Sequence, residues 1–312
     1  MRQDSIRLLL VTALLGFLLL HSSLAGAQVE KVKVGLLMIN ADAGVFLAQE
    51  KAYFREQGLA VEITYFSSSG GPQMAALTTG ELDVGSGKYI VHRGLVEPGK
   101  PFTLKDLKGK VIALNSVGGS SRLYMDGLLR KAGLRETDVI VRVLSFNDMV
   151  GALSQGAVDV AFLVQPFITI ADEKGIGVGI ADLWDLFPGH MTNNLFYSDA
   201  FIRSRPTVAE KFMAAFLKGQ RYFHDAVVKK KESLDSVVDI VAKYSRTGDR
   251  KVLRLGLSVT ELTPNGEMDL TEIQDDQDWY FQKGLVKTKV DVNKMVDLRF
   301  LHYAVQTLGF YR

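Results

Sequence analysis

Residues that could carry out catalysis are sparse in this 312-residue chain, and they are not grouped. Beyond the N-terminal segment no histidine has a second ligand-type residue at metal-site spacing; the four are His92, His190, His224 and His302. Neither a G-x-S-x-G nucleophile motif nor a phosphate-binding G-x-x-x-x-G-K-[ST] motif occurs. Cysteine is absent, which excludes thiolate nucleophiles, disulfides and cysteine-ligated metals. We therefore predict no catalytic residue, no metal site and no cofactor.

Two loops rich in glycine and serine are better suited to binding than to bond breaking. They run from Ser67 to Gly71 and from Ser116 to Ser121, and each leads into a predicted helix. Free backbone N–H groups at a helix start favour an anionic group, and small side chains let a ligand approach the backbone. Either loop on its own could equally be a helix cap or a turn.

Both loops belong to a repeated plan. The pattern Ala-Leu-x-x-Gly-x-x-Asp-Val occurs at 76–84 and again 76 residues later at 152–160, each time after a strand, a helix and another strand. This is the length of one βαβαβ half-domain, so the sequence predicts an α/β protein with two mostly parallel sheets flanked by helices. Loops at the carboxyl ends of such strands line a binding crevice. Asp83 and Asp159 end the two copies of the pattern, and we predict a structural role for them.

The N-terminus predicts export. An apolar run of 13 residues, Leu8 to Leu20, follows Arg2 and Arg7, and Ala25-Gly26-Ala27 provides a cleavage site before Gln28. We predict a cleaved signal peptide over residues 1–27, because a membrane anchor would need about 20 apolar residues. The formal net charge of +2 gives no electrostatic reason to expect nucleic acid or an anionic membrane as a partner.

The segment from Val32 to Gly87 resembles the N-terminal lobe of solute-binding proteins of ABC importers, in the group that binds nitrate, sulfonates, taurine or thiamine pyrimidines. The residues that fit are Ala48, Tyr53-Phe54, Gly58-Leu59 and Val61, although Ala52 stands where glycine is usual. The resemblance continues through Asp106 to Lys110 and through the C-terminal GLVKTKVDVNKMVDLRFL. Gln165-Pro166 stands where Glu-Pro is frequent in the group.

This resemblance implies the two-lobed type II periplasmic binding protein fold with C-terminal helices. Lobe 1 is expected over 28–103 and 204–312, and lobe 2 over 104–203, with two crossovers about which the lobes can close. The resemblance also implies a monomer in the periplasm that captures a small anionic or heteroaromatic solute of sulfonate, nitrate or pyrimidine type. The protein would deliver this solute to an ABC permease in the inner membrane.

Loops at the strand ends supply the residues that we expect to hydrogen-bond the solute. They are Asn40, Asp42, Ser68, Ser69, Gly70, Ser86, Gly119, Ser120, Ser121 and Gln165. A carboxylate at Asp42 opposes a purely anionic ligand, which suggests an amine or ring nitrogen in the solute, unless Asp42 only caps the following helix.

Two other functions stay open at the level of sequence. Fungal thiamine-pyrimidine synthases have this fold, but they are cytosolic and carry cysteine motifs that are absent here. A sensor that binds solute and reports to a membrane kinase is the other alternative. In addition, about 25 residues of the group's pattern are missing after Gly87, so we expect lobe 1 to lack a strand and a helix and to leave a sheet edge open.

Overall fold

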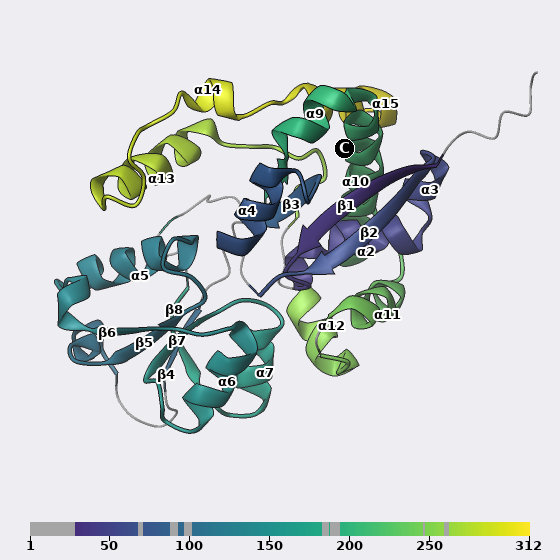
Figure 1. Cartoon of the computed structure of the whole chain (residues 1–312). Helices are drawn as coiled ribbons and strands as arrows, with labels where there is room; N and C mark the ends of the chain where they lie inside the picture. The colour runs from purple at the N-terminus through teal and green to yellow at the C-terminus, as the bar shows by residue number, and fades with distance from the viewer. Residues whose placement is uncertain are drawn as a thin grey trace, which may run out of the picture.

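Two α/β lobes lie side by side in the computed structural model (Figure 1). The structure describes residues 29–67, 71–87, 93–96, 102–182, 187, 194–245, 247–258 and 262–312. We call the part built on the sheet β2-β1-β3-β9 the first lobe and the part built on the sheet β6-β5-β7-β4-β8 the second lobe. The predicted fold class, two mostly parallel sheets flanked by helices, is confirmed.

The first sheet is parallel except at one edge. β1 pairs in parallel with β2 and β3, and β9 pairs antiparallel with β3. The strands are Glu30–Leu36 (β1), Leu59–Tyr65 (β2), Val84–Gly87 (β3) and Asn194–Tyr197 (β9). One face packs against the long helix α10 (Pro206–Val227) and the shorter α2 (Ala43–Glu50) and α3 (Tyr53–Glu56). Near the β3 edge, α4 (Gly71–Thr79) contributes Ala76 and Leu77 to a separate small apolar cluster.

The second sheet repeats this arrangement. β5 pairs in parallel with β6 and β7, and β4 runs antiparallel between β7 and β8. The strands are Arg93–Val96 (β4), Val111–Leu114 (β5), Ile140–Val143 (β6), Val160–Leu163 (β7) and Val178–Asp182 (β8). The apolar side chains of α6 (Phe146–Ser154) and α7 (Phe167–Glu173) form one core cluster, and those of α5 (Ser120–Lys131) form another.

The two sheets correspond strand by strand, with one exception. β2, β1, β3 and β9 match β6, β5, β7 and β4 in order and direction, whereas β8 has no counterpart among the described residues of the first lobe. This is the sheet edge at which we expect, from the resemblance, that a strand and a helix after Gly87 are missing. The duplication inferred from the sequence is therefore visible as two copies of one topology, of which the first is one strand shorter.

The repeated aspartates hold each copy together. Asp83 Oδ2 accepts a hydrogen bond from the Lys33 backbone N–H at 2.9 Å, and Asp159 Oδ2 accepts one from the Val111 N–H at 2.8 Å. Each carboxylate thus ties the approach to the third strand to the first strand of its own sheet. The predicted structural role of both residues is confirmed.

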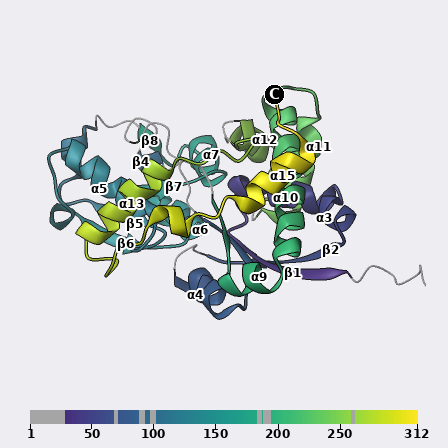
Figure 2. The same cartoon turned by 90° about the horizontal axis from the view of Figure 1, so that it is seen from above.

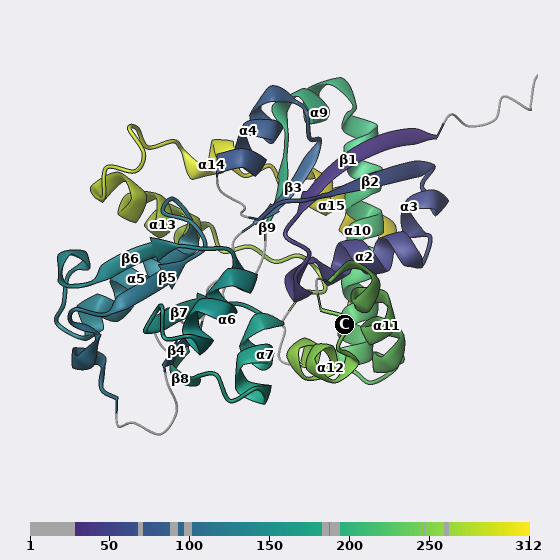
Figure 3. The ribbon, with the colours of Figure 1, turned by 60° about the horizontal axis from the view of Figure 1, so that its bottom comes forward.

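The C-terminal region covers both lobes. Its helices are α9 (Asp199–Ser204), α11 (Leu234–Tyr244), α12 (Arg250–Ser258), α13 (Leu270–Gln282), α14 (Val292–Met295) and α15 (Arg299–Leu308), and three short 3₁₀ turns lie earlier, at Asn40–Asp42, Leu104–Leu107 and Glu136–Asp138. α15 packs on α10 of the first lobe, whereas α13 lies over the second lobe (Figure 2). α12 lies beside α7, where the two lobes meet (Figure 3).

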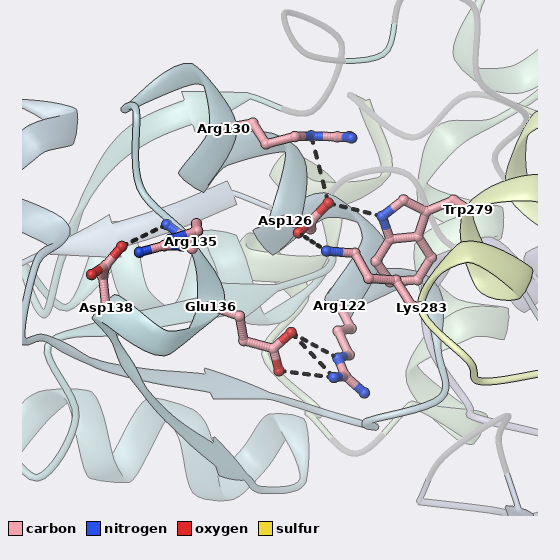
Figure 4. Close-up of polar contacts among 8 residues, drawn as sticks. All are labelled: Arg122, Asp126, Arg130, Arg135, Glu136, Asp138, Trp279 and Lys283. Carbon is pink, nitrogen blue, oxygen red and sulfur yellow. Dashed lines mark hydrogen bonds and ion pairs between the residues drawn. The ribbon is translucent and has the colours of Figure 1, made fainter.

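α13 is attached to the second lobe by a buried carboxylate. Asp126 of α5 accepts hydrogen bonds from Trp279 Nε1 at 2.8 Å and from Lys283 Nζ at 2.5 Å (Figure 4). Arg130 adds an ion pair to the same carboxylate at 3.5 Å. Burial alone would raise the pKa of Asp126, but the hydrogen bonds from Lys283 and Trp279 outweigh it and the pKa is lowered.

The strand pairing differs from the lobe boundaries expected from the sequence at both crossovers. β4, at 93–96, belongs to the second sheet, and β9, at 194–197, belongs to the first. We propose that the crossovers lie between β3 and β4 and between β8 and β9, ahead of the expected boundaries after 103 and 203. The segment carrying α13 then makes a further excursion from the first lobe to the second.

Candidate functional site

The loop between β1 and α2 is organised around a buried acid. Asp42 is 1 % exposed, and its carboxylate accepts hydrogen bonds from Ser86 Oγ at 2.6 Å and from the Ile39 N–H at 3.2 Å. Burial raises the pKa of Asp42 to about 6, against the lowering effect of the donors Ser86, Ile39, Met38 and Leu37. Asp42 and Ser86, both predicted site residues, are therefore in contact, and Asp42 also shapes its own loop.

Asn40 of the first lobe contacts the second lobe at the junction between them. Its backbone N–H points to the Gln165 carbonyl of the second lobe at 3.4 Å. Its side chain is fully buried, and neither Nδ2 nor Oδ1 has a hydrogen-bond partner within the part of the chain that the structure describes. The structure thus brings Asn40 and Gln165, which were predicted from separate halves of the sequence, into one place.

The Gln165 side chain is hydrogen-bonded to α7, the helix that begins two residues later. Its Oε1 accepts a hydrogen bond from Thr169 Oγ1 at 2.9 Å, one turn along α7. Because a hydroxyl can donate to Oε1, this contact fixes the orientation of the carboxamide and directs Nε2 elsewhere. Thr169 is 7 % exposed and was not among the predicted residues, although its position four residues after Gln165 could have indicated it.

A third segment closes this junction. A methyl group placed on Gly256 of α12 would lie 2.8 Å from Gln165 Oε1 and 2.9 Å from Asn40 Nδ2. Both distances are below those that real Cβ atoms show, so only glycine fits without displacing an amide. Gly256 could not be singled out from its sequence context, because its approach to Asn40 depends on how the C-terminal helices pack.

Apolar contacts surround these polar groups. Leu37 and Ile39 from the first lobe pack in one buried cluster with Phe146, Phe167 and Ile168 of the second lobe. Phe146 and Phe167 are stacked with ring centroids 5.6 Å apart. The amides of Asn40 and Gln165 therefore lie in a largely apolar environment, in which hydrogen bonds and charges count for more than in water.

The remaining predicted residues are not joined to this group. Ser121 is buried and donates to Asn115 Oδ1 at 2.8 Å, so it organises the start of α5. Gly119 and Ser120 stand at the same helix start, with Gly119 as the N-cap. Ser68, Ser69 and Gly70 lie outside the described residues.

The described residues offer no group of three histidine, aspartate or glutamate side chains that could hold a metal ion. In the same residues, no helix combines the length and the apolar character needed to cross a membrane. What the junction presents is a set of neutral hydrogen-bonding groups, with Asp42 as the one acid that the predicted site residues contribute.

Known proteins resemble this chain in sequence. Residues 102–226 match the family described as NMT1/THI5 like. The family resemblance inferred from the sequence is confirmed. An aliphatic sulfonates-binding protein of Bacillus subtilis is 26 % identical to the chain, and the match covers 89 % of each.

Solved structures show the same fold. The periplasmic nitrate-binding protein of Synechocystis superimposes with a TM-score of 0.75 at 15 % identity, covering 90 % of each chain. A desulfurization enzyme superimposes with a TM-score of 0.60 at 12 % identity, covering 89 % of this chain and 99 % of the enzyme. At these identities the likeness establishes the fold alone, and the fold hosts both binding and catalysis.

Proposed function

We propose that this chain is the periplasmic solute-binding component of an ABC importer. It captures a small solute between the two lobes and delivers it to a permease in the inner membrane, after a signal peptide over 1–27 has been removed. The observation that carries the proposal is the junction itself, where buried polar groups of both lobes, Asn40 and Gln165, meet within one hydrogen bond. The similarity to proteins named for binding aliphatic sulfonates and nitrate supports this role.

An enzyme is the second candidate, because the desulfurization enzyme has the same fold. The chain has no cysteine to act as a nucleophile, and the one buried acid of the junction, Asp42, is occupied by Ser86 and by backbone donors. These observations favour binding without bond breaking. A sensor that reports to a membrane kinase would use the same binding step and differs only in the partner.

A thermal-shift screen of the chain beginning at Gln28 tests the proposal. Ethanesulfonate, nitrate, an aromatic carboxylate, a pyrimidine and a sulfonamide would each be added at increasing concentration. A genuine ligand at a hundredfold excess over its Kd stabilises the protein by about 2.7 kcal/mol. If no compound in such a panel raises the melting temperature, the binding function is rejected. Mass spectrometry of the protein recovered from the periplasm checks that it begins at Gln28, and light scattering checks that it is a monomer.

A further inference from the structure

The Asn40 carboxamide is an exception among the buried side chains. Buried polar groups in proteins are almost always hydrogen-bonded, because leaving one unpaired is unfavourable. The Asn40 side chain is 0 % exposed, yet both of its polar atoms are without a partner in the described residues. Another buried asparagine, Asn265, shows the usual situation: its Oδ1 accepts from Tyr311 N–H at 2.9 Å and from Arg221 Nη2 at 3.1 Å, and its Nδ2 donates to the Tyr311 carbonyl at 3.0 Å.

A ligand that pairs with the whole Asn40 carboxamide must carry both a hydrogen-bond acceptor and a hydrogen-bond donor. It presents a donor, Nδ2, directly beside an acceptor, Oδ1, in one plane. This is true in either orientation of the amide, because exchanging Nδ2 and Oδ1 still leaves a donor beside an acceptor. A sulfonate or nitrate ion has acceptors only. It could pair with Nδ2, but it would leave Oδ1 unpaired, whereas a group with an N–H beside an oxygen acceptor pairs with both.

The surroundings of Asn40 also disfavour a bare anion. Asp42 lies two residues away in the same loop, and burial raises its pKa to about 6, as expected where negative charge is poorly solvated. The Gln165 Oε1, which approaches the same side of Gly256 as Asn40 Nδ2, is a further acceptor and is already paired with Thr169. An anion bound at Asn40 would therefore lie near a carbonyl oxygen and two residues from a buried carboxylate, and neither Asn40, Asp42 nor Gln165 supplies a positive charge to balance it.

We propose that Asn40 recognises an uncharged solute with an N–H donor next to an oxygen acceptor, as in an amide, lactam or sulfonamide, in preference to a free sulfonate or nitrate ion. This inference rests on the proposed binding function and specifies its substrate class. The solute enters when the lobes separate at the junction, and the two hydrogen bonds of Asn40 form as they close.

A matched pair of compounds tests the preference. Methanesulfonate and methanesulfonamide have nearly the same size, but only the second is neutral and carries an N–H beside its oxygens. Titration calorimetry on the chain beginning at Gln28, repeated with benzenesulfonate and benzenesulfonamide, should give the sulfonamides at least about tenfold lower Kd, which corresponds to about 1.4 kcal/mol. Equal or tighter binding of the sulfonates overturns the inference and leaves the binding function standing. If no compound of this set or of the wider panel binds, both fall.

Asn40→Leu provides a second test, because we expect it to keep or raise the stability of the protein while it weakens sulfonamide binding. Replacing an unpaired buried amide by an apolar side chain of similar size should leave the melting temperature unchanged or raise it. The same variant should lose at least about tenfold in sulfonamide affinity, again about 1.4 kcal/mol. A clear fall in melting temperature would mean that the amide is already paired within the protein, and the inference would be wrong.

Asn265→Leu is the matched control, because it removes a buried asparagine whose side-chain oxygen and nitrogen are both hydrogen-bonded. It should lower the melting temperature and leave the sulfonamide Kd of the folded protein unchanged. Asn40→Asp, which keeps the size but replaces the donor by an acceptor, should lose sulfonamide affinity as well. If Asn40→Asp binds sulfonamides as tightly as the natural protein does, Asn40 does not contact the solute.

Discussion

The buried carboxyl group of Asp42 makes the stability of the folded protein depend on pH. Its pKa in the folded chain is about 6, above the ordinary value of 3.8, because burial outweighs the hydrogen bonds that it accepts. The folded state therefore binds this proton more tightly than the unfolded state does, and stability from this group falls as pH rises from about 4 to 6. A shift of about two pKa units corresponds to about 3 kcal/mol.

We predict that Asp42→Asn removes this pH dependence. Relative to the natural chain, the variant should gain about 3 kcal/mol in the free energy of unfolding between pH 4 and pH 7, measured by urea unfolding at several pH values. Other titrating groups cancel in the difference between the two proteins. A difference that stays constant over this range would show that Asp42 keeps its ordinary pKa.

Among single residues, the polar candidates for the site could be predicted from the sequence, but the residues that pack against them could not. Asn40, Asp42, Ser86 and Gln165 were predicted because small or polar residues follow buried strands, and strand ends meet at one edge of a parallel sheet. Gly256 could not be predicted in this way. Its requirement for a hydrogen atom in place of a side chain exists only once α12 has packed against two amides from distant parts of the chain.

Among the secondary-structure elements, α13 depends on one side chain of α5. Asp126 has a 5 % exposed side chain and holds both Trp279 and Lys283, so it attaches the C-terminal segment to the second lobe. We predict that Asp126→Ala lowers the free energy of unfolding by about 2–3 kcal/mol, because a buried indole N–H loses a charged acceptor. Trp279 fluorescence should shift to longer wavelength as the indole, 5 % exposed in the structure, becomes accessible to water.

Asp199→Ala is the control for this prediction. Asp199 also pairs with an arginine four residues later, Arg203, but its side chain is 76 % exposed. An exposed pair of this kind contributes about 0.5 kcal/mol or less. Equal effects of the two substitutions would contradict the attachment of α13 through Asp126.

The ends of several helices and strands cannot be predicted from the local sequence pattern alone. Two helices, α2 and α3, follow each other closely and are separated because Ala52 adopts a left-handed backbone with φ of 63°, at the position where the related group usually has glycine. Near the C-terminus, α14 and α15 are likewise two separate helices. The short strands β4 and β9 are defined by pairing with strands remote in sequence, and periodicity does not report this.

For the whole molecule, the duplicated plan was readable from the sequence, and the placement of the C-terminal region was not. Two copies of Ala-Leu-x-x-Gly-x-x-Asp-Val predicted two sheets, and the described strands form a four-stranded and a five-stranded sheet. In contrast, residues 204–312 were expected on the first lobe throughout, whereas α13 packs on α5 of the second. The hydrophobic face of α13 is visible in the sequence, but its partner is not.

The first sheet is assembled from strands far apart in the sequence, and this has a consequence for the order in which the chain folds. The described strands of the second sheet all lie within residues 93–182. The first sheet is complete only when β9 pairs with β3, and the paired residues Val84 and Tyr197 are 113 residues apart in the chain. Closing a long loop takes more entropy than closing a short one, such as that joining Ile112 to Val160 in β5 and β7. Pulsed hydrogen exchange during refolding should therefore show β5 and β7 protected before β9. If β9 is protected first, the first lobe directs assembly instead. In the expected order, the chain passes through a stage in which the second sheet is complete and the first still lacks β9. In the solute-binding role that we propose, a chain at this stage has only one finished lobe and does not yet close on a solute.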